Sequence, residues 1–119
     1  MPERRYVSRY FFGECEGARG LVELFKNTED GPWMLFFRWG VRGGEPTRFE
    51  VTMQGYFSEV RATYKARQVV RDSFAELGIE DIEDVKVGTW DHLDALEKLI
   101  AQGWTGIAAK GVIAGSFDV

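Results

Sequence analysis

An arginine-flanked tryptophan followed by glycines is the feature of this sequence best suited to chemistry. Arg38 and Trp39 close an aromatic-rich run, and Gly40, Val41, Arg42 and two further glycines follow. Because glycine tolerates positive φ, this segment is expected to turn the chain and to present Arg42 beside Trp39. A cation held next to an aromatic ring offers a platform for a phosphate or a base. The segment is therefore the first candidate for a binding site.

Residues that could carry out catalysis or hold a metal are scarce. His92 is the only histidine and Cys15 the only cysteine, so the usual ligands of a zinc site are missing. Glu14 and Glu16 flank Cys15, and their charges oppose formation of a reactive thiolate. The glycines after Trp39 lack the Lys-Ser/Thr ending of a phosphate loop. We expect no enzymatic activity, no metal and no cofactor.

Charge is distributed unevenly along the chain. Residues 1–71 contain twelve Lys and Arg against nine Asp and Glu, a net charge of +3, whereas residues 72–119 contain three against ten, a net charge of −7. The first part is able to approach a polyanion, and the second would be repelled by one or could imitate one. The sequence shows neither the apolar run of a signal peptide nor a stretch long enough to span a membrane. We expect a cytoplasmic protein without membrane contact.

Strands are expected to fill the first part of the chain. Aromatic and β-branched residues predict strands at about 5–12 and 21–25, with a turn at 13–20 between them. Dense apolar residues predict a central strand at 33–39 that is covered on both faces. Strict alternation predicts a fourth strand at 47–53. Short connections between these strands favour an antiparallel meander with one face left for a helix.

A long amphipathic helix is expected after the strands. Ser58 is the predicted N-cap, and Gly78 is the predicted C-terminal end. The apolar stripe of this helix is expected to consist of Val60, Tyr64, Val70, Phe74 and Leu77. Its outer face is expected to carry Arg61, Lys65, Arg67 and Arg71.

The acidic remainder, residues 79–119, is expected to add a short strand at 85–88, a second helix at about 92–102 and one or two strands in the tail. The expected cap of the second helix is Thr89 or Asp91, and its expected apolar stripe consists of Leu93, Leu96, Leu99 and Ile100. The sequence thus predicts a single α+β domain over 1–119. In it, an antiparallel sheet of four or more strands packs on one long helix within 1–78, and the rest is an acidic extension.

The segment from Leu21 to Glu50, LVELFKNTEDGPWMLFFRWGVRGGEPTRFE, resembles the WGR domain of DNA-dependent poly(ADP-ribose) polymerases and of several bacterial proteins. The resemblance lies in the order and spacing of strands, turns and one helix, with Trp39-Gly40 at the end of the aromatic strand, and it covers about residues 5–78. It implies a β-sheet module with a packed helix that binds nucleic acid through the tryptophan and arginine of its motif and is no enzyme by itself. Where the family has arginine directly after Trp-Gly, this chain has Val41.

Two functions are compatible with these features. The first is a non-enzymatic module that contacts nucleic acid through a cationic face near the Trp39-Gly40 turn. Its candidate residues are Arg38, Trp39, Arg42, Arg48, Arg61, Lys65 and Arg67. The second is a small protein-binding inhibitor or adaptor of the phage anti-defence, anti-CRISPR-like type, whose acidic surface at 72–97 occupies the basic groove of a nucleic-acid-binding protein. Its candidate residues are Glu80, Asp81, Glu83, Asp84, Asp91 and Asp94.

A third hypothesis, an enzyme or small-ligand binder, rests only on the aromatic-rich sheet, which could line a pocket.

Overall fold

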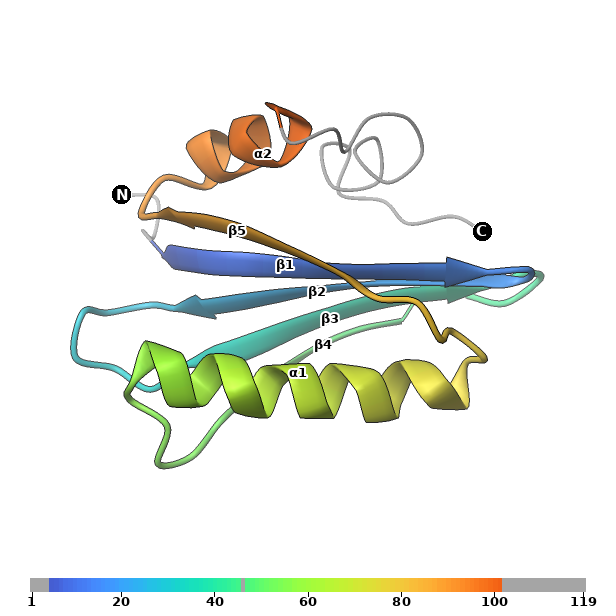
Figure 1. Ribbon diagram of the computed structural model, residues 1–119, viewed down its shortest axis with the longest axis horizontal. Helices are drawn as coiled ribbons and strands as arrows, with labels where there is room; N and C mark the ends of the chain where they lie inside the picture. The colour runs from blue at the N-terminus through green and yellow to red at the C-terminus, as the bar shows by residue number, and fades with distance from the viewer. Residues whose placement is uncertain (1–4, 46, 102–119) are drawn as a thin grey trace.

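The protein has an α+β fold in which a five-stranded antiparallel sheet lies between two helices (Figure 1). The computed structural model describes residues 5–45 and 47–101. The elements are, in chain order, β1 (Tyr6–Cys15), β2 (Ala18–Lys26), β3 (Met34–Val41), β4 (Thr47–Thr52), α1 (Glu59–Glu76), β5 (Glu83–Thr89) and α2 (His92–Ala101).

The sheet begins as the meander that the sequence predicts. Strands β1 to β4 pair with their sequence neighbours in antiparallel register. After α1 the chain returns, and β5 pairs antiparallel with the free side of β1, which gives the order β4-β3-β2-β1-β5. The acidic segment that follows α1 therefore belongs to the same sheet as the first four strands.

The connection between β1 and β2 is much tighter than predicted. The turn expected at 13–20 is wrong in extent, because β1 continues to Cys15 and β2 begins at Ala18. Gly13 and Gly20 are register partners inside the two strands. A Cβ added to Gly20 would lie 2.6 Å from Cε1 of Phe74 in α1. These glycines thus mark a close approach of the helix to the sheet and not a turn.

Helix α1 begins and ends where the sequence predicts. The Ser58 hydroxyl accepts a hydrogen bond from the backbone N–H of Arg61, and Gly78 adopts φ +81° just beyond the C-cap Leu77. The predicted apolar stripe is wrong in the first half of the helix, where Val60 and Tyr64 are 80% and 77% exposed. The residues that face the sheet are Ala62, Thr63, Ala66, Val70 and Phe74.

The reason lies in helical geometry. Residues 62, 66, 70 and 74 recur every four positions and form one face, whereas residues 60 and 64 are offset by two positions, about 200° around the helix axis. Alanines 62 and 66 bring the start of α1 close to the sheet, since a small side chain permits a short separation. The larger side chains of Val60 and Tyr64 are left on the outside.

Two apolar layers hold the sheet between its helices. The layer under α1 contains residues such as Phe11, Val22, Leu35, Phe37 and Val70, and the layer under α2 contains residues such as Val7, Phe12, Leu21, Phe25 and Ala95. Strand β2 and most of β1 are buried on both faces. The prediction that residues 33–39 form the fully covered central strand is wrong, because one face of β3 is only half-buried.

The half-buried face of β3 is the α2 face, which carries Met34, Phe36 and Arg38, and it is half-buried because α2 packs on β5 and β1.

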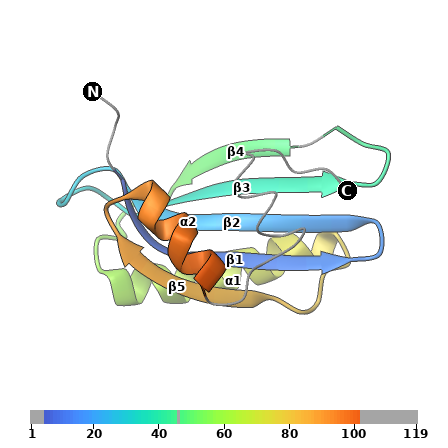
Figure 2. The same ribbon diagram turned by 90° about the horizontal axis from the view of Figure 1, so that it is seen from above.

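The α1 face of the sheet is uncovered on the β4 side. Helix α1 contacts β1 and β2 (Figure 2). Strand β4 is the last strand on its side of the sheet in the described part of the chain, and its Phe49 and Val51 are 39% and 40% exposed. The α1 side of the sheet thus ends in uncovered apolar residues.

Helix α2 packs on the opposite face of the sheet, mainly on β5. Its N-cap is Asp91, one of the two predicted caps, whose Oδ1 accepts hydrogen bonds from the backbone N–H groups of Leu93 and Asp94. Leu93, expected in the apolar stripe, is 69% exposed. The side chains of Leu96, Leu99 and Ile100 and the predicted tail strands lie outside the described residues. No helix within the described ranges is long and apolar enough to cross a membrane.

Candidate nucleic-acid interface

The structure separates the arginine and tryptophan that the sequence places side by side. Trp39 lies on the α1 face of the sheet, where its ring packs edge-on against Phe37 and Phe49 at centroid distances of 6.3 and 5.0 Å. Arg38 lies on the α2 face, with its guanidinium 4.9 Å from the ring centroid of Phe36. Neighbouring strand residues point to opposite faces, so Arg38 and Trp39 do not form one surface.

Arg38 faces a second arginine across the strands. Its register partner on β4 is Arg48, which places both side chains on the α2 face. Burial lowers the pKa of Arg38 below its ordinary value, Glu23 opposes this shift, and Arg48 adds to it. These two predicted cations therefore share a face with each other but not with Trp39.

Arg42 lies at the far end of the sheet from the start of α1. It is exposed in the turn after β3, and its backbone N–H donates a 2.7 Å hydrogen bond to the carbonyl of Gly17 in the β1–β2 turn. The start of α1 is tied to the opposite end of β3, and eight strand residues span roughly 26 Å. Arg42 and Arg61 consequently sit near opposite ends of the molecule.

Arg67 is engaged within the fold. Its Nε donates to Oδ2 of Asp84 at 2.8 Å, and Arg9 of β1 donates to the other oxygen of the same carboxylate at 2.7 Å. This triad ties α1, β1 and β5 together. In this triad Arg67, a predicted nucleic-acid contact, and Asp84, a predicted protein contact, neutralise each other.

Of the other predicted acidic residues, two are engaged within the fold and three are exposed. Asp91 caps α2, and Asp94 pairs with Lys98 at 3.2 Å. Hydrogen bonds from Thr89 and Lys98 lower the pKa of Asp94 below its ordinary value. The exposed acids of the loop before β5 and of its first residue are Glu80, Asp81 and Glu83.

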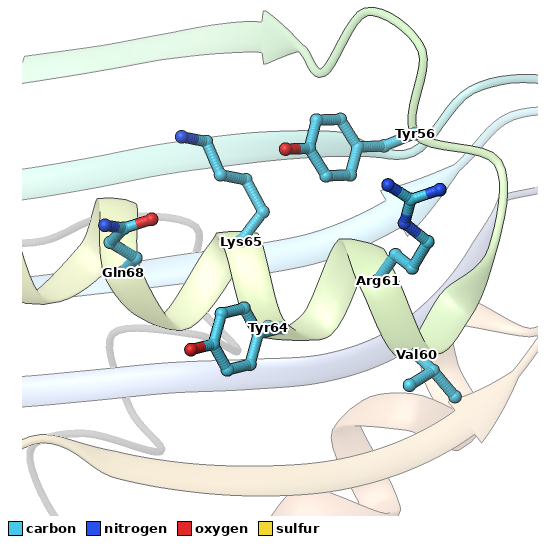
Figure 3. Close-up of a pocket in the computed structure, with 6 residues that line it drawn as sticks. All are labelled: Tyr56, Val60, Arg61, Tyr64, Lys65 and Gln68. Carbon is cyan, nitrogen blue, oxygen red and sulfur yellow. The ribbon is translucent and has the colours of Figure 1, made fainter.

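What remains of the predicted cationic surface is the first half of α1. Here Arg61 is exposed and Lys65 is half-buried, and neither has an ion-pair partner among residues 5–45 and 47–101. Both border a shallow hollow of about 380 Å³ on the outer side of the helix (Figure 3). The residues that line the hollow are Tyr56, Val60, Arg61, Tyr64, Lys65 and Gln68.

The arrangement around the hollow combines rings and cations. Figure 3 shows Tyr56, Arg61 and Lys65 reaching from the β4 side of the helix, with Tyr64 and Val60 on the other side. Phe57, in the loop that leads into the helix, is 60% exposed. From residue 59 to residue 71 the helix has four cations and one acid, and even without Arg67, which pairs with Asp84, three cations face one acid, so the local field is positive.

The loop that carries Tyr56 and Phe57 is fixed by Trp33, the residue before β3. The indole N–H of Trp33, a residue only 1% exposed, donates to the carbonyl of Phe57 at 3.1 Å, and the backbone N–H of Trp33 donates to the carbonyl of Tyr56 at 3.0 Å. A buried anchor of this kind positions the aromatic wall of the hollow before any ligand arrives.

Sequence reasoning identified two of the six lining residues, Arg61 and Lys65. It missed Tyr56 and Gln68 and assigned Val60 and Tyr64 to the core. The signal that could have found them is the pair of alanines at 62 and 66, which marks the sheet-facing side of the helix and places residues 60, 64 and 68 outside.

A separate polar cluster lies inside the sheet under α2. Glu23 of β2 is 6% exposed, and its carboxylate accepts hydrogen bonds from the Tyr10 hydroxyl at 3.2 Å and from Arg5 at 2.9 Å. Burial first, and then the charge of Glu23, raise the pKa of Tyr10 above its ordinary value. The carboxylate is satisfied within the fold, so this cluster is a structural network.

The single cysteine and the single histidine of the sequence are carried by segments that lie far apart in the fold. Cys15 is at the end of β1 far from α2, which begins at His92, because the register joins Val7 at the other end of β1 to Thr89. Within the described residues no group of three or more His, Cys, Asp or Glu is placed to hold a metal ion. Comparison with family models, curated proteins and solved structures finds no match for this chain.

Proposed function

We propose that this chain is a non-enzymatic nucleic-acid-binding module that holds an unpaired stretch of a strand against the first half of α1. The observation that supports the proposal is the exposed ring of Tyr64 beside Arg61 and Lys65, two cations without an ion-pair partner in the described part of the chain. An exposed ring stacks on an unpaired base, and base stacking on aromatic side chains contributes about 1–3 kcal/mol per base.

Phosphate contacts supply the remaining affinity in this proposal. Arg61 and Lys65 are four residues apart, so they are neighbours on the helix surface. Each phosphate that they neutralise releases counterions, which makes binding weaken as salt rises. Gln68, further along the same lining, offers an amide donor and acceptor to a base edge.

The resemblance to WGR domains supports the same class of ligand. The described chain has the implied order of strands followed by one amphipathic helix. We place the contact surface on α1 and not on the Trp39-Gly40 turn, because Arg38 and Trp39 point to opposite faces and Arg42 is near the other end of β3.

Fluorescence anisotropy of labelled single-stranded and duplex DNA and RNA, titrated at low and moderate salt, tests the proposal. We expect salt-sensitive binding that is tighter for single strands. Arg61→Glu should weaken it and reduce the log-log salt slope by about one for each phosphate that the variant no longer neutralises. Arg71→Glu is the matched control, since it makes the same charge change at an exposed position ten residues along the same helix.

The tyrosine is tested separately. Tyr64→Ala should remove the stacking contribution, a weakening of roughly 5- to 150-fold, whereas Tyr64→Phe should retain most of it. Equal weakening in Arg61→Glu and Arg71→Glu would mean that only the overall charge matters and would remove α1 as the site. No binding to any of the four nucleic acids would end the proposal.

The second candidate is the protein-binding inhibitor or adaptor, favoured by the exposed acids Glu80, Asp81 and Glu83 at the start of β5. Its target would be a basic nucleic-acid-binding protein. Reversing these three charges should abolish capture of such a protein on immobilised chain, and capture that survives the reversal would exclude this surface.

A further inference from the structure

Strand β4 presents an open edge whose sequence suits a second copy of the same strand. It has the sequence Thr-Arg-Phe-Glu-Val-Thr, and no strand lies beyond it within residues 5–45 and 47–101. Phe49 and Val51 are exposed apolar residues on its α1 face, and Arg48 and Glu50 are exposed on the other face. An edge of this kind is a template for pairing with another strand.

The hydrogen-bond pattern shows which backbone groups point outward. Met53 N–H donates to the carbonyl of its partner Trp33 at 3.0 Å, which continues the β3–β4 ladder by one residue pair. Because hydrogen-bonded and non-bonded pairs alternate in an antiparallel ladder, Val51 and Phe49 also direct their backbone groups toward β3. The backbone groups of Arg48, Glu50 and Thr52 therefore point toward the open edge.

Few registers allow an antiparallel second copy to use these groups. Pairing Arg48 with the partner's Arg48, or Glu50 with the partner's Glu50, places like charges directly opposite each other, which is destabilising. Pairing Arg48 with the partner's Glu50 places opposite charges together twice by symmetry. In that register Phe49 lies beside the partner's Phe49 on the α1 face.

We propose that β4 is the contact surface for a second copy of this chain, paired antiparallel about a two-fold axis through Phe49. The two sheets then form one continuous sheet of ten strands. Because this axis is perpendicular to the sheet, both α1 helices lie on the same face. Charges on an edge often prevent association, but alternating Arg48 and Glu50 favour one antiparallel partner, the strand itself.

The opposite edge of the sheet does not offer the same contact. Strand β5 also alternates acid and lysine at Asp84 and Lys86. Asp84, however, is already bound by Arg9 and Arg67. The β1–β5 ladder in addition has a register shift between Val7 and Arg9. The irregular ladder makes β5 a poorer edge than β4 for a regular antiparallel pair.

Sedimentation equilibrium of the full chain over a range of concentrations tests the dimer. Arg48→Glu and Glu50→Arg should each weaken self-association by about tenfold or more, since each places like charges at two symmetric contacts. The double variant R48E/E50R restores opposite charges and should dimerise like the original chain. Arg42→Glu, with the same charge change in the neighbouring turn, should have little effect.

A mixing experiment separates pairing from overall charge. R48E has two acids on β4 and E50R has two arginines, so each alone should be monomeric while an equimolar mixture should form a heterodimer. A mixture no more associated than its components would overturn the proposal, as would an original chain that is monomeric at all concentrations. The backbone amides of Arg48 and Glu50 should gain protection from hydrogen exchange as the protein concentration rises. Protection that does not depend on concentration would show that something other than a second copy covers this edge, and it would also overturn the proposal. None of these outcomes depends on nucleic-acid binding.

Discussion

Replacing Asp84 with alanine should destabilise the fold far more than is usual for an exposed acidic residue. Its carboxylate bridges Arg9 and Arg67 at 2.7 and 2.8 Å, and it is the ion-pair partner through which β1, β5 and α1 are joined. The Arg9 side chain is only 13% exposed, whereas the Arg67 side chain is 55% exposed. The two halves of the triad are therefore expected to contribute unequally.

The magnitude follows from these exposures. Without Asp84 the Arg9 guanidinium remains largely desolvated, and its Nε is already buried without a hydrogen-bond partner among the described residues. Breaking a fully buried pair costs about 3–5 kcal/mol, and an exposed pair is worth about 0–1 kcal/mol. The Asp84 side chain is 25% exposed, so we expect a loss of about 2–3 kcal/mol for Asp84→Ala and at most about 1 kcal/mol for Arg67→Ala.

Urea unfolding followed by tryptophan fluorescence measures both changes in stability. With the typical urea dependence of a small domain, Asp84→Ala should lower the midpoint by roughly 1–2 M. Arg67→Ala should remain folded and should bind nucleic acid no worse than Arg71→Ala, which removes an equivalent charge. If the urea midpoint of Asp84→Ala equals that of Arg67→Ala, the larger part of the stabilisation does not come from the pair between Asp84 and the buried Arg9, and the reasoning is refuted.

Two further predictions concern the sheet. Gly20→Ala should lower the stability by about 1–3 kcal/mol, because the added methyl group overpacks against the fully buried Phe74 ring. The control Gly44→Ala, whose added Cβ would have its nearest neighbour 3.4 Å away, should change the stability by no more than about 0.5 kcal/mol. Urea midpoints measure both changes. The raised pKa of Tyr10 keeps its proton in the folded state after the unfolded state begins to lose it, so stability should fall as pH rises above about 10. Tyr10→Phe should remove that component of the alkaline slope, and an unchanged slope would contradict the role given to burial beside Glu23.

The sequence predicted the elements well because local rules govern them. Alternation at residues 47–53 and the cap and stop at Ser58 and Gly78 depend on neighbours in the chain, and the structure confirms these features. The short strand at 85–88 is also present as part of β5, and Asp91 caps α2.

What local rules could not supply is the pairing of distant residues. Gly13 and Gly20 are typical turn residues in the sequence, but they are strand residues beneath Phe74, more than fifty positions further along the chain. The cations of the candidate site were likewise grouped by sequence proximity. Strand alternation sends Arg38 and Trp39 to opposite faces, and Arg67 meets an acid of β5 that sequence reasoning assigned to a competing surface.

The outward-facing side of α1, wrongly predicted to be apolar core, is the basis of the proposed function. Val60 and Tyr64 contribute little to the core, because α1 is already seated on the sheet through Ala62, Ala66 and Val70. The exposure of these two side chains lowers solubility and adds nothing to folding stability. A stacked base and its phosphates require an exposed ring beside cations that have no acidic partners, and α1 offers this arrangement in the described ranges. Substituting Tyr64 with a polar residue should therefore leave the urea midpoint unchanged while weakening nucleic-acid binding, and a lowered midpoint in its place would return this residue to the core.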